Sequence, residues 1–182
     1  MSQATPARPS PGRWILGGAV SGAIGAMLFG LVLMIVAPGV IAEDIPAFYG
    51  SGPSATVGWM LHVIHGAGLG IIFALVVTRA LVFETLMGPT ETAAIAGLSG
   101  HTRLALAGLV YGIAIWALLP FVGLSLLGAV GLFTDPGFGG VAAEMFIGHV
   151  LFGLLVGTLF GPFVQGAASS PGEPRGPEAA TE

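Results

Sequence analysis

Histidine is the residue type of this chain best suited to chemistry, because two of its four histidines occupy matching places in two similar segments. A histidine, two glycines and a phenylalanine recur at the same spacing: His62, Gly66, Gly70 and Phe73, then His149, Gly153, Gly157 and Phe160. The copies are 87 residues apart, and each lies in a strongly apolar run. His65 follows His62 by three residues, about one helical turn, so we expect both rings on the same side of their helix.

These histidines admit three interpretations. Since a polar ring in hydrocarbon is costly without a partner, the first is structural: a neutral imidazole bonded to a carbonyl or hydroxyl of a neighbouring helix. In the second, the histidines line a polar pocket or path for a small molecule, an ion or a proton. In the third, His62 and His149 ligate the iron of haem b from separate helices, although the outer side of the protein offers no arginine for the haem propionates.

Glu144 is the only acidic residue inside an expected span, near the outer end of that span. It precedes His149 by five residues and so lies about 140° away around the helix, which argues against a direct pair with His149. We expect its carboxylate to reach headgroup water or to bind His62 or His65 from another helix. The candidate binding residues are therefore His62, His65, His149 and Glu144.

Sequence templates for catalysis are absent. The chain has no GxSxG turn, no phosphate-binding P-loop, no HExxH motif and no cysteine. His62 and His65 alone make a weak metal motif, because no acid follows at a useful spacing. We therefore expect no enzymatic activity, no metal site and no cofactor, with haem b as the alternative.

The elements that carry these residues are expected to be membrane-spanning helices. Of the 182 residues, 54% are hydrophobic and 8% are charged, against roughly 25% charged in soluble domains, and the mean hydropathy is +0.94. Four windows reach the roughly 20 residues that cross a bilayer: 14–37, 57–83, 104–122 and 141–164. The predicted fold is an all-α, four-transmembrane-helix bundle over residues 14–165, with disordered tails at 1–13 and 166–182.

Small residues four apart occur in every expected span and let helix backbones approach closely. We expect these glycines to pack helix against helix: Gly18, Gly22, Gly66, Gly70, Gly108, Gly112, Gly153, Gly157 and Gly161. The pattern also extends the internal repeat, because Gly18 and Gly22 recur as Gly108 and Gly112 at a spacing of 90. Two tandem hairpins, at about 14–83 and 104–164, would then form a parallel repeat about a pseudo-twofold axis along the membrane normal; chance similarity between glycine-rich helices is the alternative.

Arginine sets the expected orientation. With four spans, all five arginines fall on one side of the membrane, and there is no lysine. The positive-inside rule makes that side cytoplasmic, so we expect a multi-pass protein of the cytoplasmic (plasma) membrane with both termini inside. The lipid bilayer is the expected partner, and a homo-oligomer or a larger membrane complex stays open; no long charged run points to nucleic acid.

Segments 45–50, 58–66 and 148–153 resemble a family of small four-helix membrane proteins found in haloarchaea and some bacteria. The resemblance covers residues 14–164 and implies the same fold and histidine positions. The family is functionally uncharacterised, and its members are sometimes labelled histidine kinase. This chain departs from that label, because it has no ATP-binding glycine box and no cytoplasmic domain large enough to hold one.

Together these patterns predict a non-enzymatic membrane module that binds or passes a small ligand or ion, or that serves as an accessory subunit. The alternative is an electron-transfer protein that holds haem b through His62 and His149. In either case we expect those two side chains to point into the bundle at matching depth.

Overall fold

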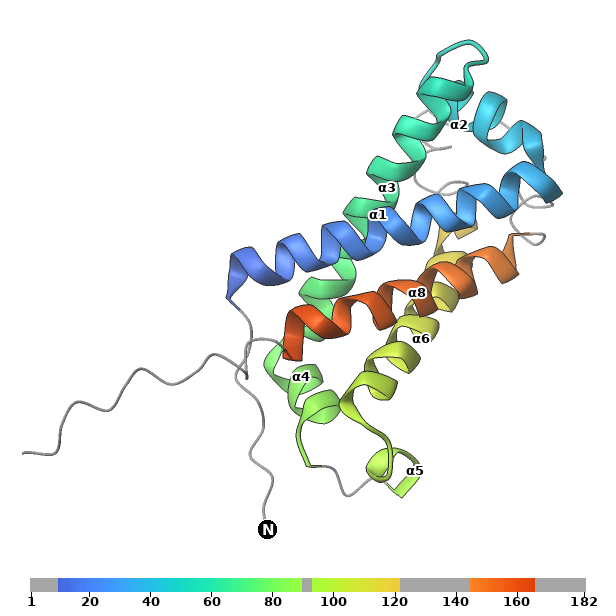
Figure 1. Cartoon of the computed structure of the whole chain (residues 1–182). Coiled ribbons are helices and arrows are strands. Elements are labelled where there is room, and N and C mark those ends of the chain that lie inside the picture. Colours follow the sequence, from blue (N-terminus) through green and yellow to red (C-terminus); the bar gives the residue numbers. More distant parts are fainter. Residues whose placement is uncertain (1–9, 90–92, 122–144, 166–182) are drawn as a thin grey trace, which may run out of the picture.

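The computed structural model describes residues 10–89, 93–121 and 145–165, and these residues are helical with short connections and no strand. Four long helices dominate: α1 (Pro11–Val36), α3 (Ala55–Val77), α6 (Gly100–Phe121) and α8 (Phe146–Gln165), labelled in Figure 1. The shorter elements are a π-helical turn η1 (Val40–Asp44), α2 (Ile45–Phe48), α4 (Ala80–Met87) and α5 (Ala93–Ala96). The predicted all-α bundle is confirmed.

All four long helices are long and apolar enough to cross a membrane, with mean hydropathies of 2.4, 2.1, 1.3 and 1.9 in chain order. Their outward faces carry large apolar side chains, among them Ile35 of α1 and Ile147 of α8, each more than three-quarters exposed. Such a surface is stable only in hydrocarbon. The chain is therefore a multi-pass membrane protein.

Helix boundaries differ from the sequence expectation, most clearly in the first two spans. The first helix begins at Pro11, inside the tail expected at 1–13, because proline suits the first turn, where no helical N–H is needed. The window expected at 57–83 is two helices, since α3 ends at Val77 and Arg79 adopts an extended conformation before α4. Thr78 closes α3 by donating its hydroxyl to the carbonyl of Ala74, 2.7 Å away.

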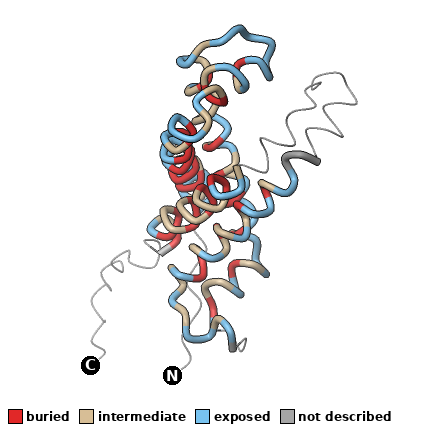
Figure 2. The backbone as a smooth tube through the Cα atoms, turned by 90° about the vertical axis from the view of Figure 1, so that its right-hand side faces the viewer, coloured by how far each residue is buried: buried red, intermediate tan, exposed pale blue. Residues whose placement is uncertain are grey.

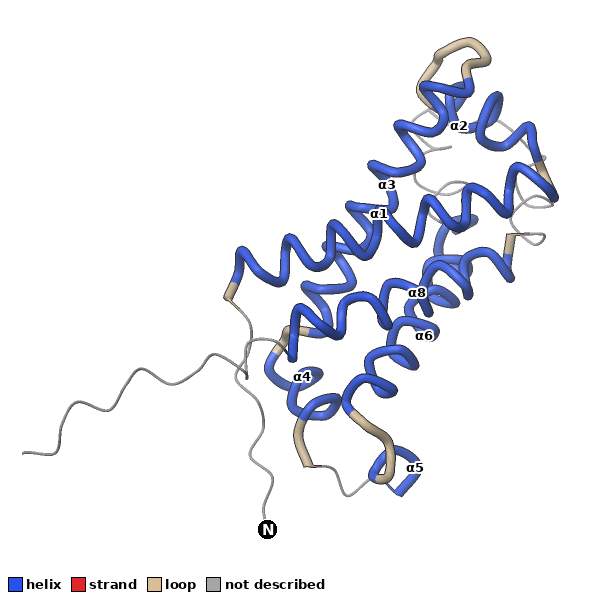
Figure 3. Tube along the Cα trace, viewed as in Figure 1, coloured by secondary structure: helices blue, strands red, loops and turns tan. Residues whose placement is uncertain are grey.

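The bundle consists of two crossed helix pairs. α1 crosses α3, α6 crosses α8, and α1 lies alongside α8 in antiparallel orientation, as Figures 1 and 3 show. In contrast, α3 makes few contacts with α6 or α8. The short helices α4 and α5 lie at one end of the bundle and α2 at the other. Buried residues follow the lines where helices meet, and the outer faces are exposed (Figure 2).

Within each crossed pair, glycines bring the two backbones into direct contact. An ideal Cβ added to Gly22 of α1 would meet the carbonyl oxygen of Gly66 and, at 2.9 Å, the Cα of Gly70 on α3. A Cβ on Gly153 of α8 would likewise meet the carbonyl oxygen of Gly108 and, at 2.6 Å, the Cα of Gly112 on α6. Any side chain at these points would force the helices apart.

The two crossed pairs use their glycines in nearly the same way, but the pairing of glycines between the repeats differs from the sequence expectation, and one glycine of the expected packing set has another kind of partner. In the first pair, Gly66 contacts Gly22 and Gly70 contacts Gly18. In the second pair, Gly153 contacts Gly108 and Gly157 contacts Leu104. By contact, Gly22 rather than Gly18 corresponds to Gly108, one helical turn from the sequence pairing. Gly161 faces the imidazole of His101 instead of a helix backbone.

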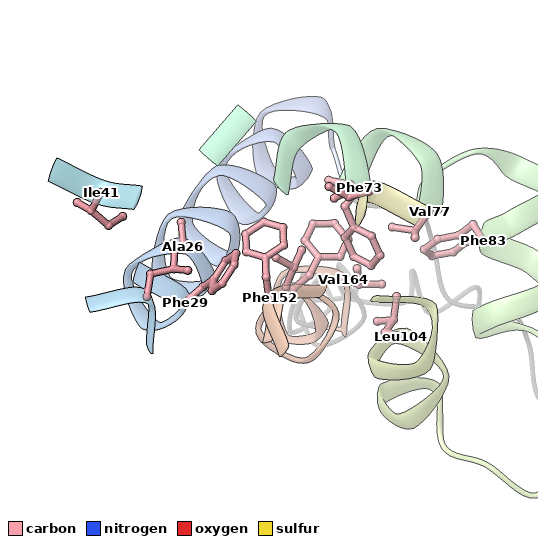
Figure 4. Packing of buried hydrophobic residues seen from close by; sticks show 14 of the residues in the cluster. Ala26, Phe29, Ile41, Phe73, Val77, Phe83, Leu104, Phe152 and Val164 are labelled. Carbon is pink, nitrogen blue, oxygen red and sulfur yellow. The ribbon is translucent and has the colours of Figure 1, made fainter. Parts of the chain in front are cut away.

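Between the two pairs, phenylalanine rings fill the space left by glycines of the facing helix. Along the contact of α1 with α8, Phe163 lies against Gly17, Phe152 against Gly25, and Phe29 against Gly148. Figure 4 shows Phe29 and Phe152 in this contact, with Phe73, Val77 and Phe83 gathered toward α4. The two crossed pairs therefore meet through aromatic side chains, whereas each pair is held by backbone contact.

Candidate functional site

His62 lies on α3 at the crossing with α1. Its Nε2 donates a hydrogen bond to the backbone carbonyl of Ala26, 3.0 Å away on α1. The imidazole meets the ring of Phe29 edge-on, at 5.7 Å between centroids, and that of Trp59 at 6.1 Å. The side chain is half-buried, so it points into the bundle.

His149 lies on α8, in the other crossed pair. Its Nδ1 donates to the carbonyl of Met145, 3.0 Å away and one turn earlier on the same helix. The imidazole meets Phe29 edge-on at 5.2 Å between centroids. Only 9% of the residue is exposed. His62 and His149 therefore contact one and the same phenylalanine ring.

Two glycines make room for the rings around these histidines. A Cβ on Gly148 would meet the ring of Phe29, with 2.5 Å to Cζ, and a Cβ on Gly30 would lie 2.6 Å from the indole of Trp59. Since neither neighbour leaves space for even a methyl group, the ring positions depend on these glycines. We call Phe29, Trp59, His62 and His149 the histidine cluster.

Each histidine of the cluster keeps one ring nitrogen available as an acceptor. A neutral imidazole donates through one nitrogen and accepts through the other, and a backbone carbonyl already takes the single N–H of each ring. This leaves the lone pairs on Nδ1 of His62 and on Nε2 of His149. Neither of these atoms is hydrogen-bonded to any residue that the structure describes.

His65 does not share the environment of His62. It is exposed, its ring stacks on that of Tyr49 at 5.6 Å between centroids, and its Nε2 is hydrogen-bonded to the Tyr49 hydroxyl. Three residues correspond to about 300° of helical rotation, so the two side chains leave α3 about 60° apart, and Tyr49 rather than the histidine cluster is the partner of His65. His65 instead ties α3 to the connection that holds α2.

Glu144 lies outside the described residues, so its expected contact with headgroup water, His62 or His65 stays a prediction. Within the described ranges, no three histidine, aspartate or glutamate side chains gather as a metal ion would require.

Two polar residues that the sequence did not single out have structural partners. The guanidinium of Arg103 is nearly buried and donates to carbonyls of the chain between α4 and α6, including that of Gly88 at 2.9 Å and those of Ile95 and Leu98 at 3.1 Å. The Tyr111 hydroxyl of α6 donates to the carbonyl of Leu69 on α3, 2.6 Å away. A single tyrosine or arginine in an apolar run signals that a partner exists, but it does not say which one.

Comparison of the chain with protein-family models, with curated proteins and with solved structures gives no match.

Proposed function

We propose that the protein is a non-enzymatic module of the plasma membrane whose histidine cluster binds or passes a small ligand or ion. One observation carries the proposal: His62 and His149, from different crossed helix pairs, contact the same Phe29 ring and each keep one acceptor nitrogen. Polar atoms are costly in hydrocarbon unless they bind something. Two such atoms beside one ring favour a ligand over a purely structural role.

The chemistry of the cluster indicates the class of ligand. Imidazole lone pairs accept hydrogen bonds, and the faces of Phe29 and Trp59 attract cations. A small hydrogen-bond donor or a small cation therefore suits the cluster better than an anion does. No arginine or lysine side chain contributes to the cluster.

An internal duplication is part of the same proposal. The contacts of Gly22 with Gly66 and of Gly108 with Gly153 support it. Each contact marks the crossing of one helix pair, and His62 and His149 each lie one turn before the glycine of their own helix in that contact. Two of the three segments that carry the resemblance to the four-helix family, 58–66 and 148–153, supply three of the four residues in the histidine cluster. We include membership of that family in the proposal.

The orientation follows the arginines, and reporter fusions test it. With both termini inside, reporters fused at Glu91 and at the C-terminus both report the cytoplasm. A signal from the outer side at either position would overturn the orientation.

Histidine NMR tests the shared site. Full-length protein labelled with ¹⁵N-histidine is titrated with methylammonium and, separately, with Zn²⁺, and the imidazole signals are followed. We expect one of these probes to shift the signals of His62 and His149 together and to leave His101 unchanged. In H149Q the response of His62 is lost. Independent responses, or no response to either probe, would refute the shared site.

Ligation of haem b by His62 and His149 is the alternative. A porphyrin between the two imidazoles would have to displace the Phe29 ring that now contacts both, which places this candidate second. Protein purified from cells supplied with a haem precursor would show a Soret band if the alternative holds.

A further inference from the structure

Among the described residues, the side of the bundle where α3 faces α6 is only sparsely packed. In a bundle with a pseudo-twofold axis between two hairpins, the contact of α1 with α8 would have its counterpart between α6 and α3. The first contact is extensive and the second is sparse. The described structure therefore departs from twofold symmetry on this side.

An apolar cavity of about 420 Å³ occupies the space between α3, α4 and α6. Its walls come from one end of α3, from α4, from α5 and from residues 103–114 of α6. The lining residues are Phe73, Val76, Val77, Val82, Leu86, Ile95, Arg103, Leu106, Ala107, Val110, Tyr111 and Ala114. Phe83 of α4 is buried, so this short helix is packed against the bundle at this end of the cavity.

The two polar side chains of the lining are already engaged. Arg103 binds backbone carbonyls around α5, and Tyr111 binds Leu69. Neither group is left to orient a polar ligand. Recognition in this cavity therefore depends on shape and on apolar contact.

The cavity faces the lipid. Three of its lining residues are among the exposed apolar side chains of the protein: Val76 at 47%, Leu106 at 42% and Val110 at 64%. A helix with its side chains is about 10–12 Å across, so even two turns of a neighbouring helix would need more volume than the cavity holds. A narrower, flexible hydrocarbon chain does fit.

We propose that this cavity binds one acyl chain of a membrane lipid, which enters sideways between α3 and α6 and extends toward α4. The site is distinct from the histidine cluster, which lies at the crossing of α3 with α1. The lipid fills the space that the sparse contact between α3 and α6 leaves.

Photolabelling tests the proposal. Full-length protein in phosphatidylcholine and phosphatidylglycerol vesicles is irradiated with a palmitic acid that carries a diazirine, and labelled residues are mapped by mass spectrometry. We expect label on Val76, Val110 and Ala114, and we expect unlabelled palmitic acid to compete it away. Label on the outer face of α1, at Leu31 and Ile35, should not be competed, because bulk lipid covers that face.

Matched variants locate the site. A114F fills the cavity and should abolish the competed label, whereas A117F places the same ring on α6 at a position that does not line the cavity and should preserve it. A107L serves as a second filling variant, and thermal midpoints identify variants that do not fold. Uncompeted label spread equally over both faces, equal loss in A117F, or links from this face to a second copy of the chain would each overturn the proposal.

Discussion

A methyl group added at Gly66 should destabilise the protein, whereas the same group two residues away at Gly68 should not. Both glycines lie on α3, but a Cβ on Gly66 would meet the Cβ of Ala26 and the carbonyl oxygen of Gly22 on α1, and a Cβ on Gly68 would meet nothing within 4 Å. G66A and G68A therefore differ only in whether the methyl group faces α1 or lipid.

The expected cost follows from the distances. The Gly22 oxygen would lie 2.7 Å from the new Cβ and the Ala26 Cβ would lie closer still, whereas ordinary contact begins near 3.4 Å. The helices α1 and α3 must therefore separate by more than about 0.7 Å, enough to lose at least a quarter to a half of each contact energy along the crossing. Overpacking of this kind costs about 1–3 kcal/mol. For a protein of this size that corresponds to a fall of roughly 2–12 °C in Tm.

The measurement compares the two variants with the unaltered chain in one detergent. Aliquots are heated, and the protein that remains monodisperse is quantified by size-exclusion chromatography. G68A should melt at the same temperature or slightly higher, because alanine favours helix over glycine by about 0.5–1 kcal/mol. Equal midpoints for G66A and G68A would refute the close contact of α1 with α3.

Three further substitutions test the histidine cluster, the link between α3 and α6, and the chain around α5. G148A forces the Phe29 ring to move, so the ¹⁵N signals of His62 and His149 should both shift; a change in His149 alone would show that the ring does not join them. Y111F removes the hydrogen bond to Leu69 and should lower the stability by about 0.6 kcal/mol and at most about 1.7 kcal/mol, measured as a fall in Tm. T158V is its control, because it removes a hydroxyl whose hydrogen bond lies within α8. R103K keeps the charge but loses the planar set of donors, so thermolysin should cut residues 88–99 faster than in R79K; equal cleavage would refute the role of the guanidinium.

The four spans could be predicted from the sequence because the hydropathy of a span is a local property. The break between α3 and α4 could not, since Arg79 interrupts an apolar run without a glycine or proline to mark the end of the helix. Glycines four apart indicated which faces would approach closely, but their register depends on the crossing of α1 with α3, which local spacing does not contain. The sequence pairing of Gly18 with Gly108 was therefore one turn away from the pairing by contact.

Only the two histidines of the histidine cluster could be predicted from the sequence. The repeated spacing pointed to His62 and His149, but Phe29 looks like any other aromatic residue of an apolar helix. Its role depends on two long-range facts: α1 lies next to α8, and Gly148 leaves space for its ring. The partner of His65 could not be predicted either, because Tyr49 lies outside the expected span.

The two kinds of helix contact suggest where a ligand would act. Contacts within each crossed pair join backbone to backbone, so displacement there meets steric resistance at once. Contacts between the pairs join phenylalanine rings to glycines, at Phe29, Phe152 and Phe163, and a ring can turn about its side-chain bonds without distorting a helix. Since Phe29 belongs to this second contact and also to the histidine cluster, a ligand that moves Phe29 would shift one crossed pair against the other, while Gly22, Gly66, Gly108 and Gly153 keep each pair intact.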